Sequence, residues 1–377
     1  MKTNFFVSLL IFLSGCQTSP FICDVNHPHP KVCQPPRAEV MIMDAELDQT
    51  KPVASEGQGS WVMASDLLIG SIGDGWIGAT SLKDRSLKWW HPVSSPVAAP
   101  TGQFGTWTVV GLRDGRVLKM ESQSGKIIWE KRSSKFISRP FVLFNQTLFA
   151  VSIKQELIAL DFRTGKAKWI YDPRVSTELI VKGAAPPVIN GSRVFFTVST
   201  GELHAVNLKT GRLIWKAKPG SSRGQGQGRF RDAMGQLFVE NNRLVMARND
   251  GMIFGLNLGQ KGDVNWKHQV SAATSAVVSG GTLFVGCLNG DVYSFDATSG
   301  RQRWKVSVGR QAVAHIHVGK QRLFLAGSKG RIAVISVAKG ELVWHDDLGG
   351  MIPGPPLVFN DRIYFATGLK ALYSYRI

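Results

Sequence analysis

The sequence has little of what several protein classes require. After residue 16 it contains no run of about 18 apolar residues, so no membrane-spanning helix is expected there. Acidic residues are scarce, since 27 Asp and Glu stand against 45 Lys and Arg and leave a net charge of +18. Such a balance attracts anionic proteins, lipid headgroups or nucleic acid, but charge alone assigns no function.

The N-terminus resembles a bacterial lipoprotein signal. Residues 1–16 read MKTNFFVSLLIFLSGC, with a positive Lys2 and an apolar stretch of secretory length. The closing letters LSGC resemble the lipobox, in which cleavage precedes the Cys and its thiol is lipidated. We therefore expect a signal peptide over residues 1–15 and a palmitate-type anchor on Cys16. In the sorting rule of this lipoprotein class, Gln17 implies the outer membrane, on its periplasmic face.

Residues 16–37 are expected to form a tether, because five prolines interrupt regular structure. Cys23 and Cys33 lie within it and flank two histidines. They can form a disulfide, which an oxidising periplasm permits, or hold a metal together with the histidines. We favour the disulfide and expect no metal site. Cys287 lies in an apolar stretch and is expected to be a buried thiol.

A ten-residue frame repeats along the rest of the chain. It is clearest at residues 160–169, LDFRTGKAKW, with Gly at the sixth place and Trp at the tenth. The frame recurs at residues 120–129, 206–215, 295–304 and 335–344, with one insertion at 256–266 and a degenerate copy without Gly at 81–90. The repeated tryptophans are Trp129, Trp169, Trp215, Trp266, Trp304 and Trp344, and the spacings from Trp90 onward are 39, 40, 46, 51, 38 and 40.

Each period has the content of one propeller blade. An apolar strand ends at the first residue of the frame, a turn with a positive-φ Gly follows, and a second strand carries the Trp. Upstream, a turn and another apolar strand recur, as at residues 190–198. Four short strands per period are typical of a β-propeller, and we expect the Trp to fill the space between blades.

The number of blades follows from counting strands. Seven frames supply seven fourth strands, and three more strands are expected at residues 356–359, 362–366 and 371–375. Residues 39–45 can supply the missing fourth strand and close the ring. We therefore predict an all-β, eight-bladed propeller over residues 38–377. A seven-bladed ring is the alternative, but it leaves the terminal strands unexplained.

The frame at residues 159–169 resembles the repeat of pyrroloquinoline-quinone-type propellers, which comprise quinoprotein dehydrogenases and the BamB family of outer-membrane assembly lipoproteins. The lipobox, the length and the blade count are similar to BamB. So are residues 176–178 with 186–191, which resemble that family's linker between its third and fourth blades, and residues 242–250. The resemblance implies a non-catalytic scaffold in a multi-subunit complex that assembles β-barrel proteins. Residues 179–185 lack the acidic residues that the family carries in its partner-contacting segment.

That departure keeps other functions open. One alternative is a scaffold subunit of another envelope machine, such as a secretion-system outer-membrane complex. Another is a module that binds an anionic lipid or polysaccharide through a basic glycine-rich loop around residues 224–228. Nucleic acid is not expected as a partner. The candidate partner contacts are Lys182, Arg223, Arg229, Arg231, Arg248 and Asp250.

A quinoprotein oxidoreductase is the third alternative, and it makes demands that the sequence meets poorly. Those enzymes resemble one another in using a calcium ion held by oxygen ligands and often a pair of adjacent cysteines. No Cys-Cys occurs here, and the nearest acidic pair, Asp346 and Asp347, is expected in a connection between blades. His315 and His317 alternate along an expected strand, where they are either metal ligands or channel and surface residues. We expect no catalytic residue and no cofactor.

Overall fold

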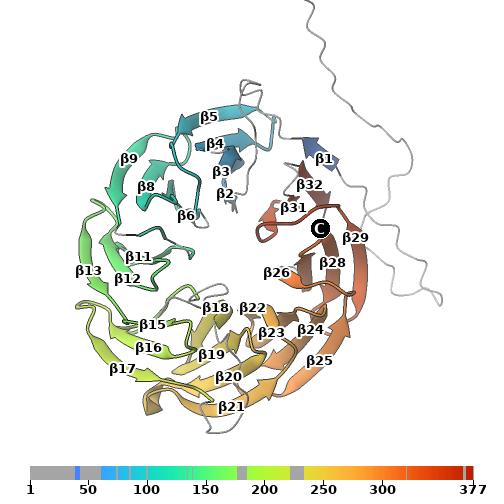
Figure 1. The fold of residues 1–377 in the computed structure, drawn as a ribbon. Coiled ribbons are helices and arrows are strands. Elements are labelled where there is room, and N and C mark those ends of the chain that lie inside the picture. Colours follow the sequence, from blue (N-terminus) through green and yellow to red (C-terminus); the bar gives the residue numbers. More distant parts are fainter. Residues whose placement is uncertain are drawn as a thin grey trace, which may run out of the picture.

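The computed structural model describes residues 39–42, 61–73, 75–84, 86–98, 101–133, 135–137, 139–175, 185–220, 233–319, 321–367 and 371–376. Within these ranges every regular element is a strand except one short 3-10 helix, η1 (Leu258–Gln260). The strands form eight four-stranded sheets arranged around a ring (Figure 1). The prediction of an all-β, eight-bladed propeller is confirmed. None of the helices in the described ranges has the length and apolar character needed to span a membrane.

Seven blades are antiparallel meanders, in which four consecutive strands run from the centre of the ring to its rim. The first blade comprises β2 (Val62–Ala64), β3 (Leu67–Gly73), β4 (Trp76–Ser81) and β5 (Leu87–Pro92), and the second comprises β6 (Gly102–Phe104), β7 (Trp107–Gly111), β8 (Arg116–Glu121) and β9 (Ile127–Arg132). The third blade comprises β10 (Val142–Phe144), β11 (Thr147–Val151), β12 (Leu157–Asp161) and β13 (Ala167–Tyr171). The fourth comprises β14 (Val188–Asn190), β15 (Arg193–Thr197), β16 (Leu203–Asn207) and β17 (Leu213–Ala217).

The next three blades are β18 (Ala233–Glu240), β19 (Arg243–Arg248), β20 (Met252–Asn257) and β21 (Asp263–Gln269); β22 (Ala273–Ser279), β23 (Thr282–Cys287), β24 (Asp291–Asp296) and β25 (Gln302–Ser307); and β26 (Val313–Gly319), β27 (Arg322–Gly327), β28 (Arg331–Ser336) and β29 (Leu342–Asp347). The insertion in the frame at residues 256–266 is η1, a single turn between β20 and β21.

The eighth blade joins the two ends of the described chain. Its strands are β30 (Leu357–Phe359), β31 (Arg362–Ala366), β32 (Ala371–Arg376) and β1 (Glu39–Ile42), in the order β1-β32-β31-β30. β1 pairs antiparallel with β32, with Glu39 opposite Ser374 and Ile42 opposite Ala371. Figure 1 shows β1 at the rim beside β32, so the predicted closure by the N-terminal strand is confirmed.

The hydrophobic core is divided into layers between blades. The middle strands are apolar on both faces, and all six residues of β23 are buried. Buried residues of neighbouring blades form one cluster at each of the eight interfaces, including the one between the eighth blade and the first. A single blade cannot bury both of its faces, so the folded ring is stabilised by contacts between neighbours.

The repeated frame makes these contacts, because the Trp of one blade packs on the frame Gly of the next. A Cβ built on Gly165 would lie 2.8 Å from Cδ2 of Trp129, on the preceding blade. Equivalent contacts are Trp89 with Gly125, Trp169 with Gly211, Trp215 with Gly262, Trp266 with Gly300 and Trp304 with Gly340. The indole Nε1 also donates to a backbone oxygen of the next blade, as from Trp89 to Ser122, Trp129 to Phe162, Trp169 to Leu208, Trp266 to Thr298 and Trp304 to Val337.

In the first blade, the Trp that packs on the next blade lies one residue before the predicted position. The frame was expected to end at Trp90, but Trp89 is the residue that docks on the second blade and is 8% exposed. Trp90 is 46% exposed and makes an edge-to-face contact with Trp76. The register shift in each third-to-fourth strand pair shows the true alignment, because Ala79 lies opposite Trp89 as Ala159 lies opposite Trp169.

The closing blade is the exception to this pattern. Its fourth strand, β1, comes from the N-terminal side of the chain, so the third and fourth strands of this blade are not consecutive. Trp344, which faces it, packs on Tyr375 with ring centroids 4.9 Å apart. Among the described residues, the buried Nε1 of Trp344 has no hydrogen-bond partner. At other interfaces the acceptor lies one or two residues after the third strand, and the residue that follows β32, Ile377, is outside the described residues.

Candidate functional site

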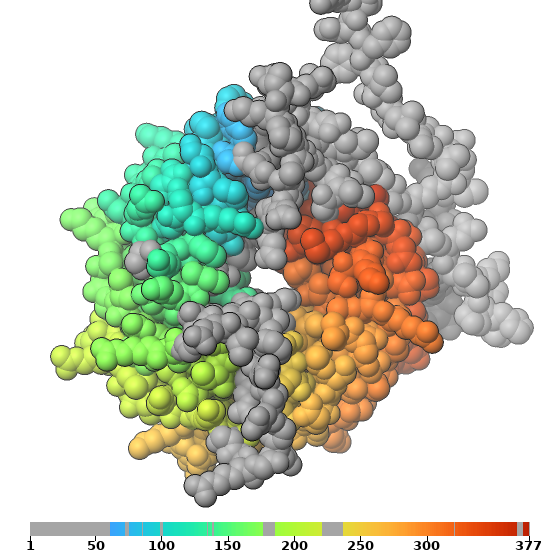
Figure 2. All heavy atoms as spheres, viewed as in Figure 1, coloured from blue at the N-terminus to red at the C-terminus, as the bar shows by residue number. Residues whose placement is uncertain are grey.

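The ring has two faces that differ in their connections. Within a blade, the turns from first to second strand and from third to fourth strand lie on one face, here called the hairpin face, because antiparallel strands alternate in direction. The connections from each rim strand to the next blade lie on the other, here called the connection face. Figure 2 shows an opening near the centre of the ring.

Most of the predicted contact and anchor residues lie outside the described residues. Lys182 belongs to the connection from β13 to β14, and Arg223, Arg229 and Arg231 to the connection from β17 to β18. Both connections leave and enter strands on the connection face. Cys16, Cys23 and Cys33, and with them the signal peptide and the tether, also lie outside the described residues.

Arg248 is described, and its position revises its predicted role. The side chain is 3% exposed at the end of β19, so it faces the protein interior. Its guanidinium binds both carboxylate oxygens of Asp250, and its Nη1 donates to the backbone oxygen of Pro219 at 3.0 Å. The ring of Phe254 lies beneath it, 5.0 Å from Cζ.

Pro219 is close to the start of the connection that carries Arg223, Arg229 and Arg231. Arg248 therefore holds the backbone of Pro219, near the start of that connection, and its guanidinium is buried against Asp250. Turn-forming residues follow it in sequence, which made a surface position the natural expectation. Asp250 is half-buried beside it and is committed to the same ion pair.

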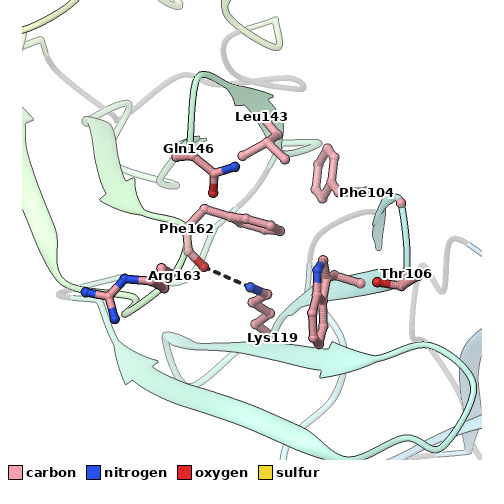
Figure 3. A pocket seen from close by; sticks show the side chains of 9 residues that line it. Phe104, Thr106, Lys119, Leu143, Gln146, Phe162 and Arg163 are labelled. Atoms are coloured by element: carbon pink, nitrogen blue, oxygen red, sulfur yellow. Dashed lines mark hydrogen bonds between the residues drawn. The ribbon is translucent and has the colours of Figure 1, made fainter.

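A pocket on the hairpin face was not predicted. It has a volume of about 640 Å³ and lies between the second and third blades (Figure 3). Phe104 and Trp107 line it from β6 and β7, Leu143 from β10, and Phe162 from the turn that follows β12. These walls are predominantly apolar and aromatic.

Lys119 on β8 brings a charge into this pocket. Its side chain is 5% exposed, and its Nζ donates to the backbone oxygen of Phe162 at 3.1 Å. Nζ lies 3.9 Å from the centroid of the Phe162 ring and 4.4 Å from that of Trp107, so it is held by cation–π contacts on two sides. Burial lowers the pKa of Lys119, and the carboxylate of Asp161 opposes that shift.

The residues considered for metal or cofactor chemistry have other partners. Asp346 and Asp347 are the last residues of β29, not part of a connection as expected. Asp346 accepts a hydrogen bond from Tyr375 at 3.0 Å, and Asp347 pairs with Arg331 at 2.8 Å. Across the described ranges, no three His, Cys, Asp or Glu side chains gather as a metal site would require.

The single histidines and the described cysteine are part of the packing. His317 is half-buried on β26 beside the ring of Phe324, and burial lowers its pKa. Cys287 is a fully buried free thiol, as predicted, and desolvation raises its pKa to about 12. A thiol in this state is unreactive, because the nucleophilic form is the thiolate.

Solved structures similar to this chain share the propeller. BamB from Moraxella catarrhalis superposes with a TM-score of 0.72 at 17% identity, covering 85% of this chain and 97% of that one. A quinohemoprotein alcohol dehydrogenase from Pseudomonas putida HK5 superposes with a TM-score of 0.66 at 11% identity, covering 84% and 73%. At these identities the likeness shows the fold alone.

The chain is similar in sequence to proteins named BamB. A relative from Bordetella pertussis, named outer membrane protein assembly factor BamB, is 24% identical over 97% of this chain and 95% of its own length. Its namesake from Escherichia coli K12 is 24% identical over 52% of this chain and 49% of its own. The family model described as outer membrane protein assembly factor BamB matches residues 73–287 and 288–376, so the chain belongs to the BamB family of PQQ-repeat propellers.

Proposed function

We propose that this protein is a non-catalytic scaffold in outer-membrane β-barrel protein assembly. The observation that carries the proposal is the family match over residues 73–376, to proteins named as outer-membrane assembly factors. The closed ring suits this role, because its loops are displayed on a rigid body that presents two broad faces. The partners would be the other proteins of the assembly complex.

The sequence supplies the proposed location. A lipid on Cys16 would hold the protein at the periplasmic face of the outer membrane, and residues 16–37 would give the ring freedom to reach its partners. Lys182, Arg223, Arg229 and Arg231 would then form a basic contact on the connection face. The carboxylates considered for cofactor chemistry, Asp346 and Asp347, are already bound to Tyr375 and Arg331, which supports a role without catalysis.

The test is purification through the native anchor after crosslinking in the membrane. We expect recovery of β-barrel assembly proteins with the wild type, and a reduced yield with the triple variant Arg223→Glu, Arg229→Glu, Arg231→Glu. The matched control reverses three exposed charges on hairpin-face turns, Lys126→Glu, Lys166→Glu and Arg212→Glu, and should retain the partners.

The outcomes separate the alternatives. Recovery of secretion-system proteins instead would replace the proposed complex, and recovery of no protein partner would end the scaffold proposal. Binding to lipopolysaccharide that falls steeply with salt, without any protein partner, would make the protein a polyanion-binding module. Calorimetric binding of the quinone together with calcium would favour an oxidoreductase.

A further inference from the structure

We propose that the pocket between the second and third blades is a binding site for an apolar carboxylate, with the ammonium group of Lys119 receiving the carboxylate. The ligand class is a single carboxylate joined to an aromatic ring or a short aliphatic chain. This inference goes beyond the scaffold role and does not depend on it, because the pocket lies on the hairpin face, away from the predicted partner contacts.

Lys119 breaks the repeat at a position that is otherwise small or apolar. It lies opposite Trp129 in the pair of β8 and β9. The equivalent residues, each opposite the docking Trp of its own blade, are Ala79, Ala159, Ala205, Gly255, Ser294 and Val334. Packing of the repeat therefore needs no charge here, and an alanine fits the same place in the first, third and fourth blades. A lysine at this site has to be explained by something other than the propeller architecture.

The charge of Lys119 is buried without an anion to balance it. Within the described part of the chain its Nζ forms no ion pair, and its one hydrogen bond goes to the backbone oxygen of Phe162. Asp161 is the nearby carboxylate that acts on it, but that group lies 3.7 Å from Nζ of Lys168 and is bound by Thr164. A buried ammonium without an anion is unfavourable, and a bound carboxylate would supply both the charge and the missing hydrogen bonds.

The space beside this ammonium suits an apolar group. Figure 3 shows the ammonium group of Lys119 beside the backbone oxygen of Phe162, with the ring of Phe104 across the opening. The ring of Trp107 lies on another side of the same ammonium group, with its centroid 4.4 Å from Nζ. A volume of about 640 Å³ is within the range of small-molecule sites, which combine apolar walls with a few polar groups. The aromatic edges of such walls pack well against a second ring.

The donor set favours a carboxylate over a phosphate. Lys119 supplies one positive charge, and the neutral polar side chains of Gln146 and Thr106 also line the pocket. Arg163 lines the pocket, but Figure 3 shows its guanidinium directed away from the centre. One ammonium matches the single charge of a carboxylate, whereas a phosphate dianion would need a second cation.

The first experiment measures binding of 3-phenylpropionate to the full chain by calorimetry and ligand-observed NMR. We expect saturable binding, at least tenfold weaker binding of the uncharged 3-phenylpropionamide, and at least a tenfold loss in the variant Lys119→Met. Met keeps the length of the side chain and should fold, because apolar residues occupy the equivalent position elsewhere. Lys166→Met, at an exposed lysine outside the pocket, is the matched control and should bind as the wild type does.

A second variant guards against a folding defect. Leu143→Trp fills the opening without removing Lys119 and should also abolish binding, with an unchanged circular dichroism spectrum. The dipeptide acetyl-Ala-Leu, with a free or an amidated C-terminus, tests whether the carboxylate of a chain end is taken in preference to a free acid. Binding of either 3-phenylpropionate or the free-acid dipeptide that depends on Lys119 supports the site. The acid that binds more tightly shows whether the ligand is a small free acid or the C-terminus of a peptide. Equal affinity of the wild type and Lys119→Met, or equal binding of acid and amide, would overturn it.

Discussion

The indole of Trp169 occupies the space that a side chain at Gly211 would need, since a Cβ built there would lie 2.6 Å from Cδ2 of the ring. Gly211 has φ 69°, and Gly191 in the same blade has φ 59° with nothing within 4 Å of the place that a Cβ would take. We expect Gly191→Ala to lower the free energy of unfolding by about 1 kcal/mol through the backbone alone. Gly211→Ala should lower the free energy of unfolding by roughly 1–3 kcal/mol more than Gly191→Ala does, because the new methyl group clashes with the indole.

Urea unfolding of the two variants measures this difference. Because both substitutions place alanine in the left-handed region, their comparison isolates the contact between blades. Equal losses would mean that the Trp–Gly contact adds nothing to stability.

The Trp at the closing interface should tolerate the loss of its indole nitrogen better than the others do. Nε1 of Trp304 donates to the backbone oxygen of Val337 at 2.9 Å, whereas Nε1 of Trp344 has no partner in the described ranges. Trp304→Phe should therefore destabilise the protein by about 1 kcal/mol more than Trp344→Phe. Thermal unfolding followed by circular dichroism is the measurement, and the reverse order would contradict the assigned hydrogen bonds.

Because β1 closes the ring, the stability of a truncated chain should depend strongly on whether the truncation removes β1. A chain starting at residue 38 keeps β1, whereas one starting at residue 44 loses its four cross-strand pairs with β32. At about 1 kcal/mol for each pair, we expect a loss of roughly 4 kcal/mol. The exposed edge of β32 should also promote self-association, seen by size-exclusion chromatography. If the shorter chain melts at the same temperature and stays monomeric, β1 does not close the ring in solution.

Arg248 should behave as a structural residue. Its guanidinium is buried against Asp250 and Pro219, so Arg248→Met should lower the free energy of unfolding by about 3 kcal/mol and leave Asp250 without its cation. Arg212→Met, at an exposed arginine, is the control and should change it by less than about 0.5 kcal/mol. Chemical denaturation decides between the roles, because a surface contact residue would show no such loss.

His204 predicts a loss of stability in mild acid. It is 1% exposed on β16 and contacts the hydroxyl of Tyr171, Glu202 and the ring of Phe196. Desolvation lowers its pKa in the folded state, with Glu202 opposing and Lys216 adding to the shift. The unfolded chain therefore binds the proton more readily, and stability falls as pH drops below about 6.5.

The measurement is urea unfolding at pH 7.5 and pH 5.5 for the wild type and His204→Gln. The variant should lose less stability than the wild type over this interval, because its side chain does not titrate. An identical pH dependence in both proteins would assign the acid sensitivity to other groups.

The fold could be predicted from the sequence because the propeller is periodic. Repetition of the Gly and Trp places fixes the hairpins, and the unmatched strands at residues 39–45 and 356–375 decide the blade count. The sequence alignment of the frame in the first blade differs from the structure by one residue, because Trp89 and Trp90 are adjacent. Its frame lacks the Gly that marks the turn, and the register shift that selects Trp89 is a backbone feature.

The site was less predictable, since burial depends on neighbours that are distant in sequence. Arg248 is followed by Asn249, Asp250 and Gly251, which are typical of an exposed turn, but its guanidinium is bound by Pro219, near the start of the earlier connection from β17 to β18. Lys119 had a detectable signal, because aligning the frames places it where other blades have small or apolar residues. Its aromatic surroundings come from β7 and from the next blade and could not be seen in its own segment.

The pairing of residue 39 with residue 374 also sets the order in which the protein can be completed. The seven other sheets are built from consecutive strands, so each can form soon after its own segment is available. β1 can pair only after β32 is available. Joining these two strands closes a loop that contains nearly the whole chain, so we expect this step to be slow relative to the formation of the local hairpins. Until β1 is added, the eighth sheet consists of β30, β31 and β32, and β32 presents an unpaired edge. During that interval the unpaired strand edges of the incomplete ring are the part of the molecule most able to pair with another chain.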